Sequence, residues 1–488
     1  MTEFKVELPD VRDTFRDDKF ALTDKGLVKS STGNVIAALM NPVYARQDGI
    51  IDGQFFYDSF RNEMKYKGRL CGENLSSETV RRIDDNLINK IGIEIERHYE
   101  IGFSGQRTLD AIRYVTNECT INTAAQHLDH LKWNGDEDAI RKLLPTYLGA
   151  EDTSLNAWIM EHMIVGMVKR IVEPGSKFDE MMVLVGAQGI GKSTFSRYLS
   201  LNDDWFCSIG DIKNKDVVIN MMGKAVVEVE EFVALRKIKS AGEAKAFISK
   251  SVDTIRVPYD KFSSDVKRTS ILIGTLNEME FLNDHTGERR YLPVKCDIKK
   301  RKKPIYPLPE FLCGLTNRQY EESVRADFEN AVAYGYKLYK EDQHQMTLPF
   351  DLADMLEDVQ EKCKYEDPDV TDIEDFLYAH KPSTDDPYRC CWKEYSLLGY
   401  KLDHIEFGLI MVNYFPEWVK HSSTKTEHLY PNGRGERNRI ATKCYYELKR
   451  TDETKEELTE DLSEQKKEMD TEGFVQMEIP DIVSQKKS

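Results

Sequence analysis

The chain has 488 residues, of which 40% are hydrophobic and 31% are charged, and its formal net charge is −17. This length exceeds what one hydrophobic core supports, so we expect about three domains. The composition is ordinary for a globular protein. The acidic balance argues against a wholly basic nucleic-acid-binding protein, although the distribution of charge matters more than its sum.

The sequence also bears on the cellular compartment. Residues 1–5 lack the basic-then-apolar pattern of a secretory signal, and no run approaches the ~18 apolar residues of a membrane span. The nine cysteines include no C-x-x-C pair, so neither a zinc ribbon nor a disulfide framework is indicated. We therefore expect a cytoplasmic protein without a membrane partner.

Residues 1–110 carry weak signals. The segment 48–57 has the pattern of a short strand pair around a turn, and 77–99 has apolar residues at helical spacing. We expect a small α/β domain over 1–110, to which the sequence assigns no chemical role.

Residues 111–180 predict a helical region that precedes the core. Residues 133–136 indicate a turn between helices, and 155–172 predict a long apolar helix that Glu173, Pro174 and Gly175 end. We interpret its apolar side chains as core packing.

The strongest pattern is the octapeptide 186–193, GAQGIGKS, which reads G-x-x-x-x-G-K-[ST] and is called here the glycine-rich loop. An apolar run at 181–185 predicts a buried strand before it, and a helix can begin at Thr194. Such a turn directs backbone N–H groups and the helix dipole at a polyphosphate. We predict that it is a P-loop that binds ATP. The predicted nucleotide-binding residues are Gly186, Gln188, Gly189, Ile190, Gly191, Lys192, Ser193 and Thr194.

The motif assigns separate roles to two of these side chains. Lys192 would reach the β- and γ-phosphates, and the Ser193 hydroxyl would bind Mg²⁺. ATP and Mg²⁺ are therefore the expected ligands. The alternative is a chance glycine-rich turn between a strand and a helix.

The segment 224–232 is an apolar strand that ends in acids, as a Walker B segment does. One carboxylate would contribute to the Mg²⁺ site, and its neighbour would accept the proton of an attacking water. Alternation places Glu228 and Glu230 on one face and Glu231 on the other. We predict Glu231 as the base, with Glu230 or Glu228 beside the metal.

Residues 253–270 predict a β-hairpin or loop that projects before the next core strand. Its basic and aromatic residues would contact a DNA backbone, although a solvated loop is an equal alternative. These residues are Arg256, Tyr259, Lys261, Lys267 and Arg268.

The segment 270–277 predicts a third core strand, and Asn277 at its tip would orient the attacking water. The adjacent pair Arg289 and Arg290 would be an arginine finger, given in trans to the γ-phosphate of a neighbouring subunit. The alternative for the pair is a surface salt bridge. The ATPase core is expected to span 181–310.

The rest of the chain divides by composition. Residues 311–364 read as a helical extension, and 365–387 as an Asp- and Pro-rich linker. Residues 388–450 predict a small winged-helix-like domain that binds DNA, with a turn at 430–435 and a strand at 441–448. Residues 451–488 predict an acidic, disordered tail. The basic residues expected to contact DNA are Arg434, Arg437, Arg439 and Lys443.

These motifs in this order resemble the virulence-associated protein E family over about 120–300. The segments that carry the resemblance are 133–135, 174–177, 186–193, the acidic strand, 274–277 and 286–291. The family comprises P-loop ATPases of phages and phage-related islands, similar to superfamily 3 helicases. The chain departs from it in two respects. No acidic primase site is evident in 1–110, and the Walker B acids are not a plain Asp-Glu pair.

The resemblance implies an AAA+-like, ring-forming replicative helicase or initiator. The fold expected is an α/β P-loop NTPase core with helical flanks and a small carboxy-terminal winged-helix-like domain. The function expected is ATP-dependent unwinding of origin DNA by a hexamer in a bacterial host. Its partners would be single-stranded and origin duplex DNA, and a primase or phage replication protein. The alternatives are a regulatory or defence P-loop ATPase that switches a protein partner, and an initiator whose ATPase drives only assembly.

Overall fold

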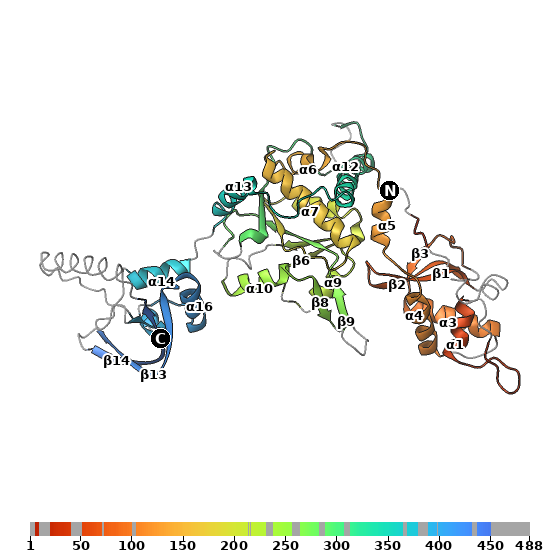
Figure 1. The fold of residues 1–488 in the computed structure, drawn as a ribbon, viewed down its shortest axis with the longest axis horizontal. Coiled ribbons are helices and arrows are strands. Elements are labelled where there is room, and N and C mark those ends of the chain that lie inside the picture. Colours follow the sequence, from red (N-terminus) through yellow and green to blue (C-terminus); the bar gives the residue numbers. More distant parts are fainter. Residues whose placement is uncertain are drawn as a thin grey trace, which may run out of the picture. The chain divides into compact units, whose positions relative to one another are not determined.

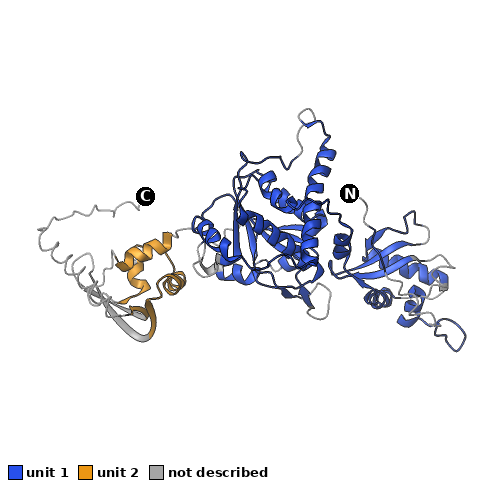
Figure 2. Ribbon diagram, turned by 45° about the horizontal axis from the view of Figure 1, so that its top comes forward, with its two compact units in different colours: residues 1–365 blue, residues 366–488 orange. Residues whose placement is uncertain are grey.

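A computed structural model describes residues 5–8, 20–40, 51–70, 73–99, 104–212, 214, 216–230, 238–255, 264–282, 288–306, 313–364, 368–378, 389–397, 399–431 and 437–449. The chain divides into two compact units, residues 1–365 and residues 366–488, which Figure 2 colours separately. No helix in these ranges is both long enough and apolar enough to cross a lipid bilayer.

The amino-terminal part of unit 1 is a mixed sheet with the strand order β3-β2-β1-β4, covered by helices. Its elements are α1 (Thr32–Met40), β1 (Ile51–Asp58), β2 (Glu63–Leu70), β3 (Val80–Arg82), α3 (Asp85–Tyr99), α4 (Gly105–Asn117) and β4 (Thr120–Ile121). Phe55, Tyr66 and Ile112 belong to the buried cluster that joins the sheet to the helices.

Two predictions in this part were wrong in detail. The segment 48–57 was predicted as a strand pair, but the described part of it is one strand, β1, which pairs with β2. The helix predicted from residue 77 begins only at Asp85, because β3 pairs with β2 before it. Helix α4 crosses the predicted boundary at residue 110 and packs on this sheet.

The core of unit 1 is a parallel five-stranded sheet with the strand order β11-β5-β10-β7-β6. Its strands are β5 (Met181–Val185), β6 (Phe206–Ile209), β7 (Val226–Glu230), β10 (Ile271–Leu276) and β11 (Tyr291–Lys295). The register pairs Leu276 with Val185 and Thr275 with Glu230, so these strands end at the same edge. Residues that follow the strands therefore meet at that edge.

Helices cover both faces of this sheet (Figure 1). They are α5 (Thr123–His130), α6 (Ala139–Tyr147), α7 (Ser154–Val172), α8 (Lys192–Leu199) and α12 (Asn317–Lys340) on one face, and α9 (Val217–Met221) and α10 (Ile238–Ile248) on the other. Burial on both faces explains why β5 and β10 read as continuous apolar runs. Helix α13 (Phe350–Glu361) also contacts β11.

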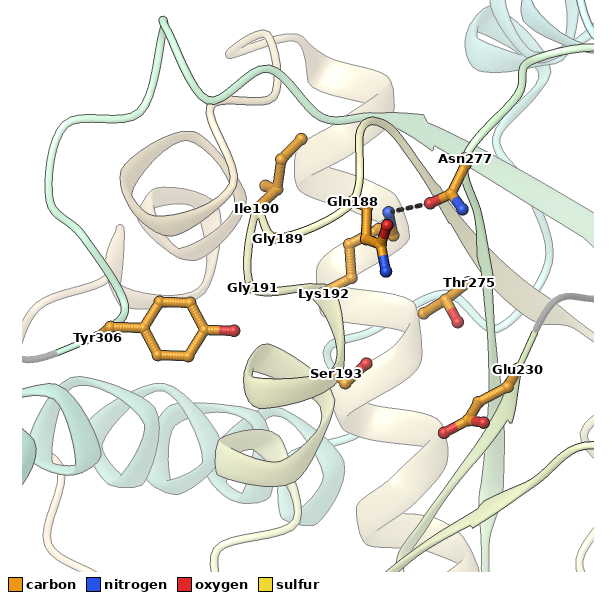
Figure 3. A pocket seen from close by; sticks show the side chains of 10 residues that line it. All are labelled: Gln188, Gly189, Ile190, Gly191, Lys192, Ser193, Glu230, Thr275, Asn277 and Tyr306. Atoms are coloured by element: carbon orange, nitrogen blue, oxygen red, sulfur yellow. Dashed lines mark hydrogen bonds between the residues drawn. The ribbon is translucent and has the colours of Figure 1, made fainter.

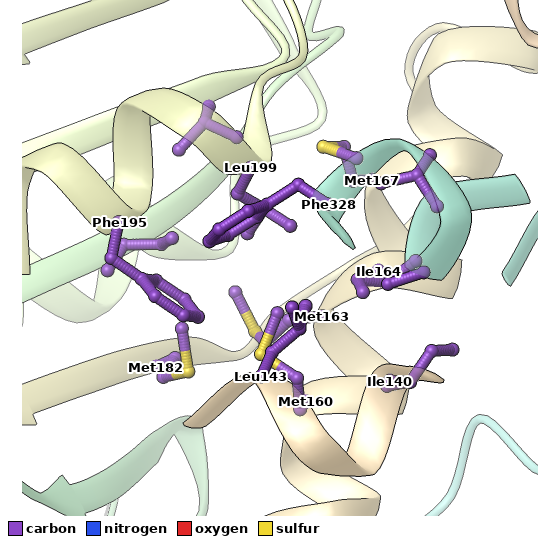
Figure 4. Close-up of a cluster of buried hydrophobic side chains, with 14 of the residues drawn as sticks. Ile140, Leu143, Met160, Met163, Ile164, Met167, Met182, Phe195, Leu199 and Phe328 are labelled. Atoms are coloured by element: carbon purple, nitrogen blue, oxygen red, sulfur yellow. The ribbon is translucent and has the colours of Figure 1, made fainter. Parts of the chain in front are cut away.

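Helix α7 is the centre of the larger buried cluster, where its methionines meet side chains of α6, α8 and α12 (Figure 4). The helix predicted over 155–172 is confirmed, and the Thr153 side chain caps its first turn. The turn predicted at 133–136 lies between α5 and α6. Phe328 of α12 is fully buried against Phe195, so the aromatic residues of α12 that are buried serve packing.

The β-hairpin predicted at 253–270 is present as β8 (Val252–Ile255) paired with β9 (Ser264–Lys267). Its tip, which contains Arg256, Tyr259 and Lys261, lies outside the described residues.

Unit 2 has helices and strands in the order α14, β12, α15, α16, β13, β14, with the strand order β12-β14-β13. The elements are α14 (Pro368–Tyr378), β12 (Arg389–Cys390), α15 (Trp392–Leu397), α16 (His404–Tyr414), β13 (Trp418–Pro431) and β14 (Arg437–Leu448). The linker predicted at 365–387 is partly wrong, because α14 buries Ile373 and Phe376. The strand predicted at 441–448 is the second half of β14, and residues 451–488 lie outside the described part.

Candidate functional site

The glycine-rich loop joins the end of β5 to the start of α8. Gly191 is the N-cap of α8 and has a φ of 107°, and Gly189 has a φ of 82°. Residues other than glycine rarely adopt these positive φ angles. A Cβ atom on Gly186 would lie 2.6 Å from the carbonyl oxygen of Cys296. A Cβ atom on Gly191 would lie 2.4 Å from Ile305 Cγ2. Conformation and close packing therefore both require glycine in this loop.

The loop borders a cavity of about 240 Å³ at the carboxyl edge of the core sheet (Figure 3). The residues that line it come from the loop, from β7, from β10 and from the chain after β11. They are Gln188, Gly189, Ile190, Gly191, Lys192, Ser193, Glu230, Thr275, Asn277 and Tyr306.

The Lys192 ammonium is held at the base of this cavity. Lys192 is 8% exposed, and its Nζ donates to the carbonyl oxygen of Gly186, to that of Ala187 at 3.1 Å and to Asn277 Oδ1 at 3.2 Å. None of the three acceptors is charged. Burial lowers the pKa of Lys192, because it disfavours the charged form. An anion in the cavity would relieve this unfavourable burial of the ammonium.

Glu228 of β7 connects the loop to the neighbouring strand β10. Its Oε1 accepts hydrogen bonds from Ser193 Oγ at 2.7 Å and from Thr275 Oγ1 at 3.0 Å. Glu228 is 1% exposed, and its Oε2 has no hydrogen-bond partner within the described ranges. Burial raises the pKa of this carboxyl group. A buried carboxylate with an unsatisfied oxygen beside a hydroxyl group suits a hard cation such as Mg²⁺.

Glu228 and Glu230, the two predicted acids that the structure describes, occupy different places. Glu230 lines the cavity and is exposed, and its Oε1 accepts from Ser208 Oγ of β6 at 2.5 Å. Of the two acids predicted beside the metal, only Glu228 contacts Ser193. Glu231 lies outside the described residues.

Two residues of the cavity were missed by sequence reasoning. Thr275 is a polar residue in the apolar strand β10, and alternation places it on the same face as Asn277, so it could have been found. Tyr306 is distant in sequence from the glycine-rich loop, and the chain that follows β11 brings it to the cavity. No local pattern indicated it.

The pair Arg289 and Arg290 lies away from the cavity. The pair directly precedes β11, whose first residue, Tyr291, is in register with Met181, the first residue of β5. It is therefore at the opposite edge of the sheet from the glycine-rich loop of the same chain. Arg290 Nε donates to Ser249 Oγ at 2.9 Å, whereas Arg289 is exposed.

Among the residues predicted to bind DNA, Arg268 does not fit the prediction. It is 4% exposed, and it pairs with the buried Asp253 through Nε at 2.6 Å and Nη2 at 3.3 Å. Its Nη1 donates to the carbonyl oxygen of Phe247 at 2.5 Å. Its charge is thus paired within the chain, at the base of the hairpin β8–β9. Lys267 beside it is exposed.

The structure gives no account of the predicted basic side chains of unit 2. Arg437, Arg439 and Lys443 are on β14, but their side chains lie outside the described part. Arg434 lies outside it altogether.

Residues 128–365 match the family model of the virulence-associated protein E-like domain. This range contains the glycine-rich loop and all five strands of the core sheet, so the resemblance predicted from the motifs is confirmed. The chain is also similar to two apo structures of the NrS-1 C-terminal region, at 14% and 13% identity. The matches cover 80% and 82% of this chain and 96% and 97% of those chains, with a TM-score of 0.41 in both cases. A search of curated proteins gives no match.

Proposed function

We propose that this chain, whose residues 128–365 form a virulence-associated protein E-like domain, is a Mg²⁺-dependent ATPase that unwinds DNA in the replication of a phage or related mobile element. The observation that carries the proposal is the arrangement of Lys192, Ser193 and Glu228 around the glycine-rich loop. It lies at the carboxyl edge of a parallel sheet, where open α/β sheets bind their ligands.

The phosphates of ATP would be bound by the loop and by Lys192. The start of α8 has no side-chain cap, so its first backbone N–H groups would serve as donors to an anion, which the helix dipole also favours there. Lys192 would exchange its uncharged carbonyl acceptors for phosphate oxygens, which are stronger partners for an ammonium group. This exchange would make binding of the triphosphate favourable.

Ser193 and Glu228 would hold Mg²⁺. The ion supplies positive charge that neutralises the β- and γ-phosphates. The hydroxyl of Ser193 and both oxygens of Glu228 would become ligands or partners of its bound water. Glu228 is buried, and its Oε2 has no hydrogen-bond partner among the described residues, which supports this assignment over the exposed Glu230.

Hydrolysis would use residues that follow the neighbouring strands. Glu231, directly after β7, is the proposed base that accepts the proton of the attacking water. Asn277, directly after β10, would orient that water. Its hydrogen bond with Lys192 supports this role, because Lys192 is the proposed partner of the γ-phosphate.

Coupling to DNA would involve the hairpin β8–β9 and unit 2. The order α-β-α-α-β-β of unit 2 supports the proposed winged-helix-like domain. The subunits would form a ring, proposed to be a hexamer, in which Arg289 or Arg290 reaches the nucleotide of a neighbour.

A strand-displacement assay on forked DNA, run together with ATP turnover, tests the proposal. We expect ATP hydrolysis that DNA stimulates, and displacement that requires both ATP and Mg²⁺. Hydrolysis without displacement, but with assembly on duplex DNA, would instead support an initiator. Hydrolysis that DNA leaves unchanged would support a regulatory or defence ATPase that switches a protein partner.

A further inference from the structure

Tyr306 is a large, half-exposed aromatic residue at the rim of the cavity. It is 45% exposed, and its hydroxyl accepts a hydrogen bond from Thr194 Oγ1 at 3.2 Å. In the view of Figure 3 its ring lies on one side of the start of α8, and Asn277, Thr275 and Glu230 lie on the other. The ring therefore borders the cavity away from the residues that mark the site of hydrolysis.

The backbone that carries this ring is anchored. Ile305 is fully buried and lies under Gly191, where a Cβ atom would approach it to 2.4 Å. The carbonyl oxygen of Pro304 accepts from the hydroxyl of Tyr320 at 2.5 Å. The two residues before Tyr306 are thus held against the core, while its own ring is half-exposed beside a polar cavity. Packing alone does not explain an aromatic residue at this position.

The direction of a bound triphosphate follows from the charged groups. Lys192 and Asn277, which are hydrogen-bonded to each other, would hold its terminal phosphate, and Ser193 and Glu228 would hold the ion. The nucleoside must then leave the cavity on the other side, past Thr194. That path leads to Tyr306.

We propose that Tyr306 is the surface on which the nucleobase of the bound nucleoside triphosphate stacks. This inference rests on the proposed function, because it needs the triphosphate in the cavity. An aromatic ring offers its face to any base. The contact adds affinity for the nucleoside and none for the phosphates.

Calorimetric titration of the full chain with Mg²⁺ and either ATP or inorganic tripolyphosphate tests this division. Stacking on an aromatic side chain is worth about 1–3 kcal/mol per base, and we take the lower end for the half-exposed Tyr306. We therefore expect Tyr306→Ala to weaken ATP binding about tenfold, which is about 1.4 kcal/mol. Its affinity for tripolyphosphate should stay unchanged.

Two matched variants complete the experiment. Tyr306→Phe keeps the ring and should bind ATP within about twofold of the original protein, because stacking needs no hydroxyl. Lys192→Ala should weaken the binding of both ATP and tripolyphosphate. Thermal unfolding of each variant verifies that it is folded.

The outcomes separate the two ideas. If Tyr306→Ala weakens ATP and tripolyphosphate equally, or weakens neither, the stacking role is wrong while the phosphate site stands. If Tyr306→Phe loses as much ATP affinity as Tyr306→Ala, the hydroxyl is what matters, and stacking is again excluded. If the unchanged protein binds neither ligand, the proposed function and the stacking role both fail.

Discussion

Replacing Glu228 with glutamine separates the effect of this side chain on the stability of the protein from its contribution to the proposed Mg²⁺ site. Glu228 is 1% exposed, and one of its carboxylate oxygens has no hydrogen-bond partner within the described ranges. Burial of a carboxylate that is incompletely paired destabilises the native state relative to the unfolded chain, where water solvates both oxygens. We therefore expect Glu228→Gln to make the nucleotide-free protein more stable.

The pH dependence of this gain follows from the pKa of Glu228, which burial raises. A stabilising substitution of this kind yields ~0.5–2 kcal/mol, and each kcal/mol corresponds to about 2–4 °C in Tm for a large domain. Because the native pKa lies above the unfolded value, the native state favours the protonated form, and the carboxylate destabilises it at higher pH. The advantage of glutamine should be largest above the native pKa and should shrink as pH falls through it.

Thermal unfolding over a range of pH measures the gain in stability. Thermal unfolding with added ATP and Mg²⁺ measures the loss of ligand binding. A ligand at 100 times its Kd stabilises a protein by about 2.7 kcal/mol. The original protein should gain more stability from ATP with Mg²⁺ than from ATP alone, and Glu228→Gln should lose that difference. Glu230→Gln is the matched control, because Glu230 is exposed and should change the stability by less than about 0.5 kcal/mol. A nucleotide-free Glu228→Gln protein that is less stable than the original, or that keeps the full Mg²⁺ effect, would refute this reasoning.

Two other substitutions test the site and the hairpin. Lys192→Ala should abolish ATP turnover while the protein stays folded, because the ammonium is bonded to three uncharged acceptors among the described residues and forms no ion pair with them; near-normal turnover in the folded variant would rule out the P-loop assignment. Arg268→Ala should lower the free energy of unfolding by up to about 3–5 kcal/mol, because it leaves the buried Asp253 with the half-exposed Lys250, at 3.4 Å, as its remaining ion-pair partner among the described residues. Lys267→Ala, at an exposed neighbour, should change it by less than about 0.5 kcal/mol, and equal effects would contradict the buried pair.

The sequence predicted best those elements whose pattern reflects burial on every side. Helix α7 and strands β5 and β10 were predicted almost to the residue. The apolar runs of the two strands reflect the two covered faces of a parallel sheet, and α7 is buried along most of its length. The glycine-rich loop was predicted equally well, since positive φ angles and close contacts require its glycines. These are local requirements, and local sequence carries them.

Predictions failed where the partner of a residue comes from elsewhere in the chain. Alternation assigned faces to Glu228 and Glu230, but only the fold brings Ser193 and Thr275 to Glu228. Arg268 was read as an exposed cation, because its partner Asp253 lies across a hairpin.

The same limit explains the missed secondary structure. β3 forms by pairing with β2, although its sequence continues a helical pattern. α14 forms in an Asp- and Pro-rich segment because Ile373 and Phe376 pack into the core of unit 2. In both elements tertiary contacts outweigh local propensity.

The position of the arginine pair leads to a prediction about assembly. Arg289 and Arg290 precede β11, at the opposite edge of the sheet from the glycine-rich loop, and a five-residue strand spans about 17 Å. They therefore cannot serve the nucleotide of their own chain unless the fold changes. The Arg290 side chain donates a hydrogen bond to Ser249 within its own chain. The exposed Arg289 is therefore the better candidate to reach the nucleotide of a neighbouring subunit.

Mixing two inactive proteins tests this action in trans. Arg289→Ala keeps its phosphate site and Lys192→Ala keeps its arginine, yet each alone should lose about 10³-fold or more of its ATP turnover. In a ring with head-to-tail interfaces, random mixing at equal amounts pairs an intact phosphate site with an intact arginine at about a quarter of the interfaces. Turnover should return to about that fraction of the original. Arg290→Ala is the control, because it removes the same charge from a side chain that Ser249 holds. If the mixture stays inactive although the two proteins assemble together, or if dilute monomer hydrolyses ATP at the full rate, Arg289 does not act on a neighbour.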